Sequence, residues 1–152
     1  MIQAIGDALA FRGRLTRLGY WRWQIALALI TAGFAYGAVA VAIGGGPRWL
    51  SALVFAPMVV ALIAAVGVVA RRLHDRGRGT RWLVVFLLAP WSLTALSIWL
   101  SEGRVFVEQS WVMPAAAAAA LLSLLFNLWA FVEIGLLRGQ PGPNRFGPPP
   151  AQ

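Results

Sequence analysis

The sequence contains no cysteine, no lysine and few charged residues of either sign. Without cysteine the chain has no disulfide, no thiol nucleophile and no thiolate metal ligand. All 13 basic residues are arginine and only five residues are acidic, so the formal net charge is +8. His74 is the only histidine, and a zinc site normally needs three or four protein ligands. We therefore expect no metal site and no cofactor.

Charged residues make up 12% of the chain and hydrophobic residues 60%. Soluble domains contain about 25% charged residues and about 45–50% hydrophobic residues. A soluble core built from 152 residues has too little interior to hide so much apolar surface, and large exposed apolar patches aggregate. The composition therefore excludes a soluble globular fold, a disordered chain, a coiled coil and a nucleic-acid-binding domain of the usual kind. A lipid bilayer is the environment that fits.

Long stretches without charge divide the chain into four candidate membrane spans, and only the last of them contains an acid, Glu133. They cover residues 23–43, 49–70, 82–100 and 112–137. A span needs about 20 apolar residues. A charge at the centre of the bilayer costs about 2.5–3.5 kcal/mol, so long charge-free stretches indicate segments that cross the membrane.

We therefore predict an all-α membrane protein, a four-span transmembrane helical bundle that forms one integral membrane domain over residues 1–152. The Pro/Gly-rich tail, residues 139–152, should be extended and non-helical.

The arginines are distributed unevenly between the two sides of these spans. Eleven of them lie in the N-terminal segment, the second loop and the tail, whereas the first and third loops hold only Arg48 and Arg104. Because cytoplasmic loops carry the excess of arginine, we expect both termini and the second loop to be cytoplasmic.

Several local signals refine these helices. Thr16 can cap the first helix, and Gly77 and Gly79 should end the second. The glycines at the ends of residues 33–37 have the spacing that lets membrane helices approach closely, within this chain or between two copies. The alanines at 115–120 form a smooth face against which another helix can pack.

The densest polar feature is the run RRLHDRGRG at residues 71–79. If the second helix continues beyond the membrane, Arg71 and Asp75 are neighbours at i,i+4. Three interpretations remain open: arginines that only fix the topology, a specific intramolecular or lipid-phosphate site, or a catalytic site. Glu133 is an intramembrane acid and hence a functional candidate, or it pairs with an inner arginine such as Arg71, Arg72 or Arg138.

Three segments together resemble a known family. They are FRGRLTRLGYW at residues 11–21, RRLHD at residues 71–75 and GQPGPNRFGP at residues 139–148. In order and membrane context they are similar to the YhaH-like bacterial inner-membrane proteins, the domain of unknown function 805 family. The resemblance spans almost the whole chain and implies a multi-pass protein of the bacterial cytoplasmic membrane. It implies no activity, because the family is uncharacterised.

The sequence departs from the family pattern at three places. Gly19 stands where the family commonly has an acid, so Thr16 lacks its reciprocal capping partner. Gly79 and Arg81 replace a serine and a tryptophan after the His-Asp pair. The apolar region between the second and third segments is longer here than in compact members, and we interpret it as two full spans.

On this topology the three segments meet at the cytoplasmic face. We expect them to form a polar cap there, either a structural clasp that ties the tail across the helix ends or a pocket for an anionic group. The candidate residues are Arg12, Arg14, Arg17, Arg71, Arg72, His74, Asp75, Asn144 and Arg145.

The first functional hypothesis is a non-enzymatic membrane protein whose cap binds anionic phospholipid or a partner protein. The alternative is a small transporter or channel subunit, and a third hypothesis is an intramembrane enzyme acting on a lipid phosphate through His74 and Asp75. The expected partners are the bilayer itself, a second copy of the chain or another membrane protein, and not nucleic acid.

Overall fold

The computed structural model describes residues 11–103 and 111–150, so Arg104 lies outside the described residues. Regular secondary structure in these ranges is helical, and the only pairing of extended backbone there is an isolated bridge between Asn144 and Gly147. Four helices of the described part are long and apolar enough to cross a membrane, which confirms the predicted all-α class.

The chain divides into two compact units. The first contains the residues up to Arg78 together with those from Arg138 onward, and the second is Gly79–Leu137. The first unit is therefore built from two pieces of sequence that are separated by the whole of the second unit.

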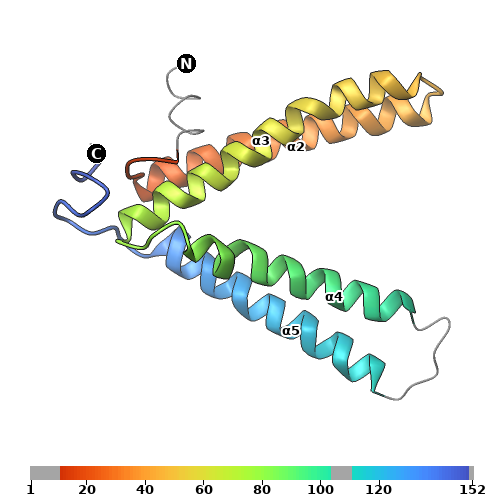
Figure 1. Ribbon diagram of the computed structural model, residues 1–152. Coiled ribbons are helices and arrows are strands. Elements are labelled where there is room, and N and C mark those ends of the chain that lie inside the picture. Colours follow the sequence, from red (N-terminus) through yellow and green to blue (C-terminus); the bar gives the residue numbers. More distant parts are fainter. Residues whose placement is uncertain (1–10, 104–110, 151–152) are drawn as a thin grey trace. The chain divides into compact units, whose positions relative to one another are not determined.

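The first unit is a helical hairpin of α2 (Arg17–Ile43) and α3 (Arg48–Asp75), which run side by side in opposite directions (Figure 1). Thr16 caps α2 as predicted, because its Oγ1 accepts a hydrogen bond from the Gly19 amide at 3.0 Å. Both helices extend several residues beyond the charge-free stretches, to Arg17 in α2 and to Asp75 in α3.

The two helices of this hairpin pack through small side chains. Leu27 of α2 lies in a buried cluster with Ala61 and Ala64 of α3. A Cβ atom added to Gly37 would lie 3.4 Å from Val54 Cγ1, so this glycine faces α3 in ordinary contact distance. The first glycine of the 33–37 pattern has no neighbour within 4 Å of such a Cβ. Of these two glycines, therefore, only Gly37 lies at the contact between α2 and α3.

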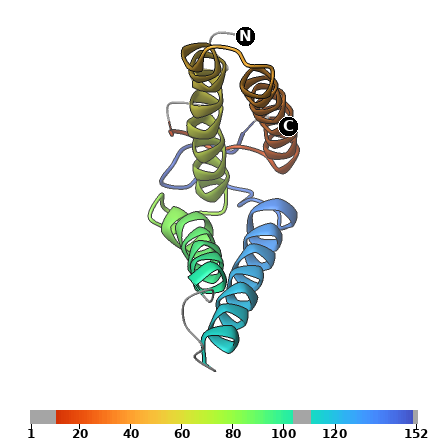
Figure 2. The same cartoon turned by 90° about the vertical axis from the view of Figure 1, so that its right-hand side faces the viewer.

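The second unit is also a helical hairpin, and two of its helical segments are π-helical. Its elements are η1 (Val84–Leu88), α4 (Ala89–Gly103), α5 (Val112–Ala130) and η3 (Phe131–Leu136). Figure 2 shows α4 and α5 as neighbours in a view turned from that of Figure 1. The charge gaps predicted these two helices, but they did not predict the π-helical turns.

Small and hydroxyl residues line the contact between α4 and α5. Ala116 and Ala119 of α5 are buried, as expected for the alanine-rich face. Ser123 donates a hydrogen bond to the carbonyl of Pro90 at 2.9 Å, and its Oγ lies 2.7 Å from Thr94 Oγ1. This contact is therefore uncharged, with hydroxyl groups satisfied inside the hairpin.

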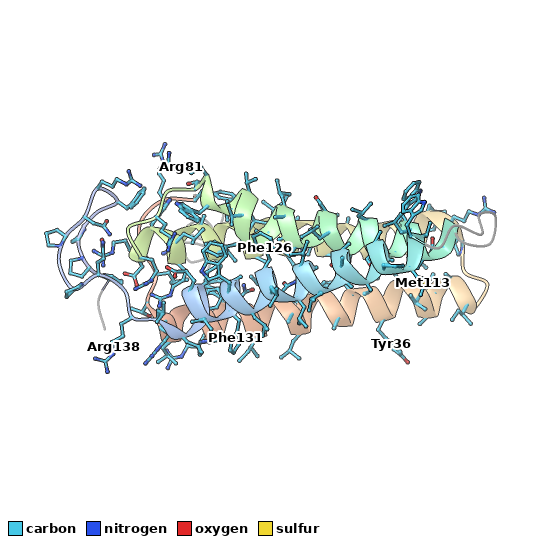
Figure 3. All side chains as sticks on the ribbon, turned by 90° about the horizontal axis from the view of Figure 1, so that it is seen from below. Tyr36, Arg81, Met113, Phe126, Phe131 and Arg138 are labelled. Atoms are coloured by element: carbon cyan, nitrogen blue, oxygen red, sulfur yellow. The ribbon has the colours of Figure 1, made fainter. Side chains whose placement is uncertain are left out.

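The outer faces of the helices are strongly apolar. In α2 the exposed fractions are 70% for Leu29, 78% for Tyr36 and 82% for Ile43, and Tyr36 extends away from the helix in Figure 3. Soluble monomers rarely expose contiguous apolar surface on this scale. These faces are suited to hydrocarbon, so the chain is a multi-pass membrane protein.

Candidate functional site

The candidate site begins where α3 ends. Arg76 is the C-terminal cap and Gly77 has a φ of 72°, which glycine adopts without steric cost. The Arg78 amide donates to the Leu73 carbonyl at 2.8 Å, and the Gly77 amide donates to the His74 carbonyl at 2.9 Å. This pair of bonds is a Schellman motif. It confirms the predicted role of Gly77 and holds residues 71–75 in the last helical turn.

Two other segments complete the capping of this helix end. The Leu15 amide donates to the Arg71 carbonyl at 3.2 Å, and the Gln140 amide donates to the Asp75 carbonyl at 2.8 Å. The last four carbonyls of a helix have no partner within the helix, so the Gln140 amide satisfies one of them, and the Leu15 amide adds a bond to the carbonyl that precedes them. We call this assembly the clasp: residues 13–16, residues 71–75 of α3 and the tail residues 139–147.

Asp75 lies at the centre of the clasp between two arginines. Arg14 donates to Asp75 Oδ1 from Nε at 3.1 Å and from Nη2 at 2.9 Å. Arg72, one turn before Asp75 in α3, donates to Oδ2. The three side chains are 5% exposed or less. A buried ion pair loses much of its hydration, so losing one partner is far more costly than losing a surface charge.

This pairing differs from the one expected from the sequence. The expected neighbour of Asp75 at i,i+4 was Arg71, whereas the observed ion pair inside α3 is at i,i+3, from Arg72. Arg72 is fully buried, while Arg71 is half-buried and its Nε has no hydrogen-bond partner in the part of the chain that the structure describes. The face of α3 that turns inward decides which arginine reaches the carboxylate.

Arg14 also connects the tail to the rest of the clasp. Its Nη1 donates to the Gly142 carbonyl at 2.6 Å and to the Gly147 carbonyl at 3.4 Å, and its Nη2 donates to the Gln140 carbonyl. Together with the two bonds to Asp75, all five N–H groups of the guanidinium have acceptors. Arg14 therefore acts as a structural connector, and its donors are already used.

Gly139 brings the tail into close contact with the ion pair. A Cβ atom added to this residue would lie 1.8 Å from Asp75 Oδ2. Real Cβ atoms do not come within 3.0 Å of another heavy atom, so a side chain at residue 139 would displace the tail backbone or the Asp75 carboxylate, which two arginines hold in place. Only glycine allows the backbone to pass here, so residue 139 fixes where the tail crosses the end of α3.

His74 is held by contacts on more than one side. Its Nδ1 lies 3.1 Å from the carbonyl oxygen of Gly13, and because a carbonyl can only accept, Nδ1 carries the proton. The ring stacks on Phe146 with 4.0 Å between ring centres and 7° between planes. The imidazole therefore joins the N-terminal segment to the tail.

Asn144 forms the turn that returns the tail to α3. Its Nδ2 donates to the His74 carbonyl and to Gln140 Oε1, both at 3.0 Å, and its Oδ1 accepts from the Phe146 amide at 2.9 Å. The tail is non-helical as predicted, but it is not simply extended, because it turns at residues 144–147. In Figure 2 it runs beside the end of α3.

The remaining candidate residues lie outside the buried part of the clasp. Arg145 is exposed, with its guanidinium carbon 4.8 Å from the centre of the Phe146 ring. Arg12 and Arg17 are exposed as well. Glu133 belongs to η3 of the second unit, where it is buried, and its pairing with an inner arginine stays a prediction.

A groove of about 630 Å³ lies next to the clasp. We call it the arginine groove. It is lined by the start of α2, the end of α3 and the tail, with the residues Thr16, Arg17, Leu18, Arg72, Asp75, Arg138, Gly139, Gln140, Pro141, Pro149 and Pro150. Its volume is in the range of small-molecule sites, about 300–1,000 Å³. Arg138 is exposed at the beginning of the tail (Figure 3).

Some residues have a structural role that the sequence did not assign to them. Gly139, Gln140 and Phe146 hold the tail. They lie inside the quoted tail motif, which was the available signal. Arg138 lines the groove, whereas its sequence position suggested only a possible pairing with Glu133. Across residues 11–103 and 111–150 no three His, Asp or Glu side chains gather as a metal site would require.

The fold and the clasp define a class of protein: a multi-pass helical membrane protein with a buried Arg–Asp network at one end of a helical hairpin. A family model described as "Protein of unknown function (DUF805)" matches residues 8–148. The chain therefore belongs to this family, which confirms the resemblance carried by its three motifs. No curated protein and no solved structure matches the chain.

Proposed function

We propose that this protein is a non-enzymatic protein of the bacterial cytoplasmic membrane that binds anionic phospholipid at its cytoplasmic face. The observation that carries the proposal is the excess of exposed arginine around a clasp whose own ion pairs are internally satisfied. The buried arginines hold the scaffold, and Arg12, Arg17, Arg138 and Arg145 around them are exposed at the surface.

The charge balance at this end of the α2–α3 hairpin supports the proposal. Among the described residues it holds a single acid, Asp75, and ten arginines: Arg12, Arg14, Arg17, Arg22, Arg71, Arg72, Arg76, Arg78, Arg138 and Arg145. Guanidinium groups match the geometry of phosphate oxygens. Each arginine near an anionic membrane surface contributes about 1 kcal/mol. Anionic lipid is therefore a natural partner for this face.

Lipid preference tests the binding part of the proposal. The wild-type protein in a neutral detergent is titrated with phosphatidylglycerol and with phosphatidylcholine, and native mass spectrometry counts the lipids retained. We expect the anionic lipid to bind about tenfold more tightly, and added salt to reduce this preference. Equal retention of the two lipids would contradict the proposal.

Side-specific labelling tests the orientation, and the absence of cysteine makes the experiment simple. Pro47→Cys places a thiol in the turn between α2 and α3, and Pro143→Cys places one in the tail, and both positions are exposed. A membrane-impermeant maleimide should label the first variant in intact spheroplasts and the second only after lysis. The opposite pattern would place the arginine groove outside the cell.

A further inference from the structure

The lining of the arginine groove combines two exposed cations with hydrogen-bond donors. Arg17 and Arg138 come from opposite ends of the chain and both line it. The Oγ1 of Thr16 accepts from the Gly19 amide, which leaves its hydroxyl proton available to donate to a bound oxygen. The groove also adjoins the N-terminus of the 27-residue helix α2, where the partial positive charge favours an anion.

The carboxylate of Asp75 also lines the groove, and an isolated carboxylate would repel an anion. Here Oδ1 accepts two hydrogen bonds from Arg14 and Oδ2 accepts one from Arg72. Two guanidiniums therefore surround one carboxylate, and this part of the wall is not negative. It is compatible with an anionic ligand.

The other walls are apolar. Leu18, Pro141, Pro149 and Pro150 present hydrocarbon to the same space. A bare inorganic phosphate has nothing to bury against these side chains, and it needs far less room than about 630 Å³. A phosphate carried on a glycerol and acyl framework can place its oxygens on the arginines and its carbon atoms on the prolines and the leucine.

We infer that the arginine groove is a binding site for the phosphate diester of an anionic glycerophospholipid, held by Arg17, Arg138 and Thr16. This inference rests on the proposed function and adds a defined site, a small number of bound lipids and named residues. A free phosphate shares the same oxyanion chemistry, so the experiment distinguishes the two sources.

The first experiment compares two charge-matched double variants by native mass spectrometry in neutral detergent, where no charged bilayer is present to attract all the arginines. Arg17→Gln with Arg138→Gln removes two groove charges. Arg12→Gln with Arg22→Gln removes two charges from exposed arginines that do not line the groove. We expect the groove variant to bind phosphatidylglycerol about ten- to thirtyfold more weakly than the wild type and the control less than about threefold.

A second pair of variants tests the site without removing an arginine. Leu18 is 59% exposed in the first turn of α2, where an acidic side chain favours the helix. Leu18→Glu should therefore fold normally and still lose phosphatidylglycerol binding about tenfold, because a carboxylate then stands in the groove. Leu18→Gln, of the same shape without the charge, should retain most of the binding.

Competition separates the two phosphate sources. Inorganic phosphate at the concentration of the added lipid should leave phosphatidylglycerol in place, and displacement by phosphate would overturn the lipid assignment. Equal losses in the two double variants, or normal binding by Leu18→Glu, would overturn the groove while the proposed function survives. A wild-type protein without preference for anionic lipid would contradict both the groove site and the proposed function.

Discussion

The two hairpins hold their paired helices together with different polar contacts. Both bury alanines between their helices, Ala61 and Ala64 in the α2–α3 hairpin and Ala116 and Ala119 in the α4–α5 hairpin. The polar contacts then differ, because the first hairpin ends in a buried ion-pair network and the second is joined by neutral hydroxyl groups.

The position of each polar contact along its helix explains the difference. The ion pairs of α3 follow the charge-free stretch that ends at residue 70, whereas Ser123 lies inside the charge-free stretch of α5. A charge deep in hydrocarbon costs several kcal/mol, but a hydroxyl group can satisfy itself on a neighbouring carbonyl. The contacts of Ser123 and Thr94 inside the fourth and third spans are thus neutral, whereas the Arg14–Asp75 and Arg72–Asp75 pairs lie at the end of α3, where their loss should have a much larger effect.

The largest effect is expected from the centre of the clasp. Asp75→Asn removes the carboxylate from two buried guanidiniums, so the free energy of unfolding should fall by about 3–5 kcal/mol. Denaturant titration in detergent, followed by circular dichroism, measures the loss. Glu102→Gln in α4 changes the same functional group at an exposed position and should be nearly neutral. Equal stability of these two variants would remove the distinction between the hairpins.

An intermediate effect is expected where the tail crosses the ion pair. Gly139→Ala places a methyl group against Asp75 Oδ2, which should cost about 1–3 kcal/mol and loosen the tail. Gly142→Ala makes the same change three residues later, where a Cβ meets nothing within 4 Å, and should have little effect. Limited proteolysis of the tail compares them. Faster cleavage of Gly142→Ala than of Gly139→Ala would contradict the close contact between Gly139 and Asp75.

The smallest effect is expected inside the second hairpin. Ser123→Ala deletes the hydrogen bond to the Pro90 carbonyl and the contact with Thr94. Interhelical hydrogen bonds of neutral groups in membranes average about 0.6 kcal/mol, so a loss of this size is expected in the same denaturant titration. A loss as large as that of Asp75→Asn would mean that the neutral contacts are equally important.

The sequence predicted the features that depend on local pattern. Gaps between charges located the helices, Thr16 was recognised as a cap, and Gly77 as a helix end. These follow from residue type and neighbours in sequence. The choice of Arg72 over Arg71 as the partner of Asp75 depends on which face of α3 turns inward, and no nearby residue specifies it.

The contacts of Arg14 were beyond sequence reasoning for a different reason. Its acceptors are 61 to 133 residues away, and three of them are backbone carbonyls, which every residue possesses. The arginine groove likewise depends on the path of the tail. A resemblance identified the tail motif as important, but only the folded tail shows that Gly139 passes the ion pair.

The division of the first unit into two pieces of sequence has a consequence for biosynthesis. Residues 13–16 and 71–75 leave the ribosome well before residues 139–147, and the whole second hairpin is made in between. Until the tail arrives, three of the acceptors of Arg14 are missing and the end of α3 lacks its last cap. The helices of the first hairpin are therefore synthesised early, but the clasp can close only after residues 139–147 have been synthesised.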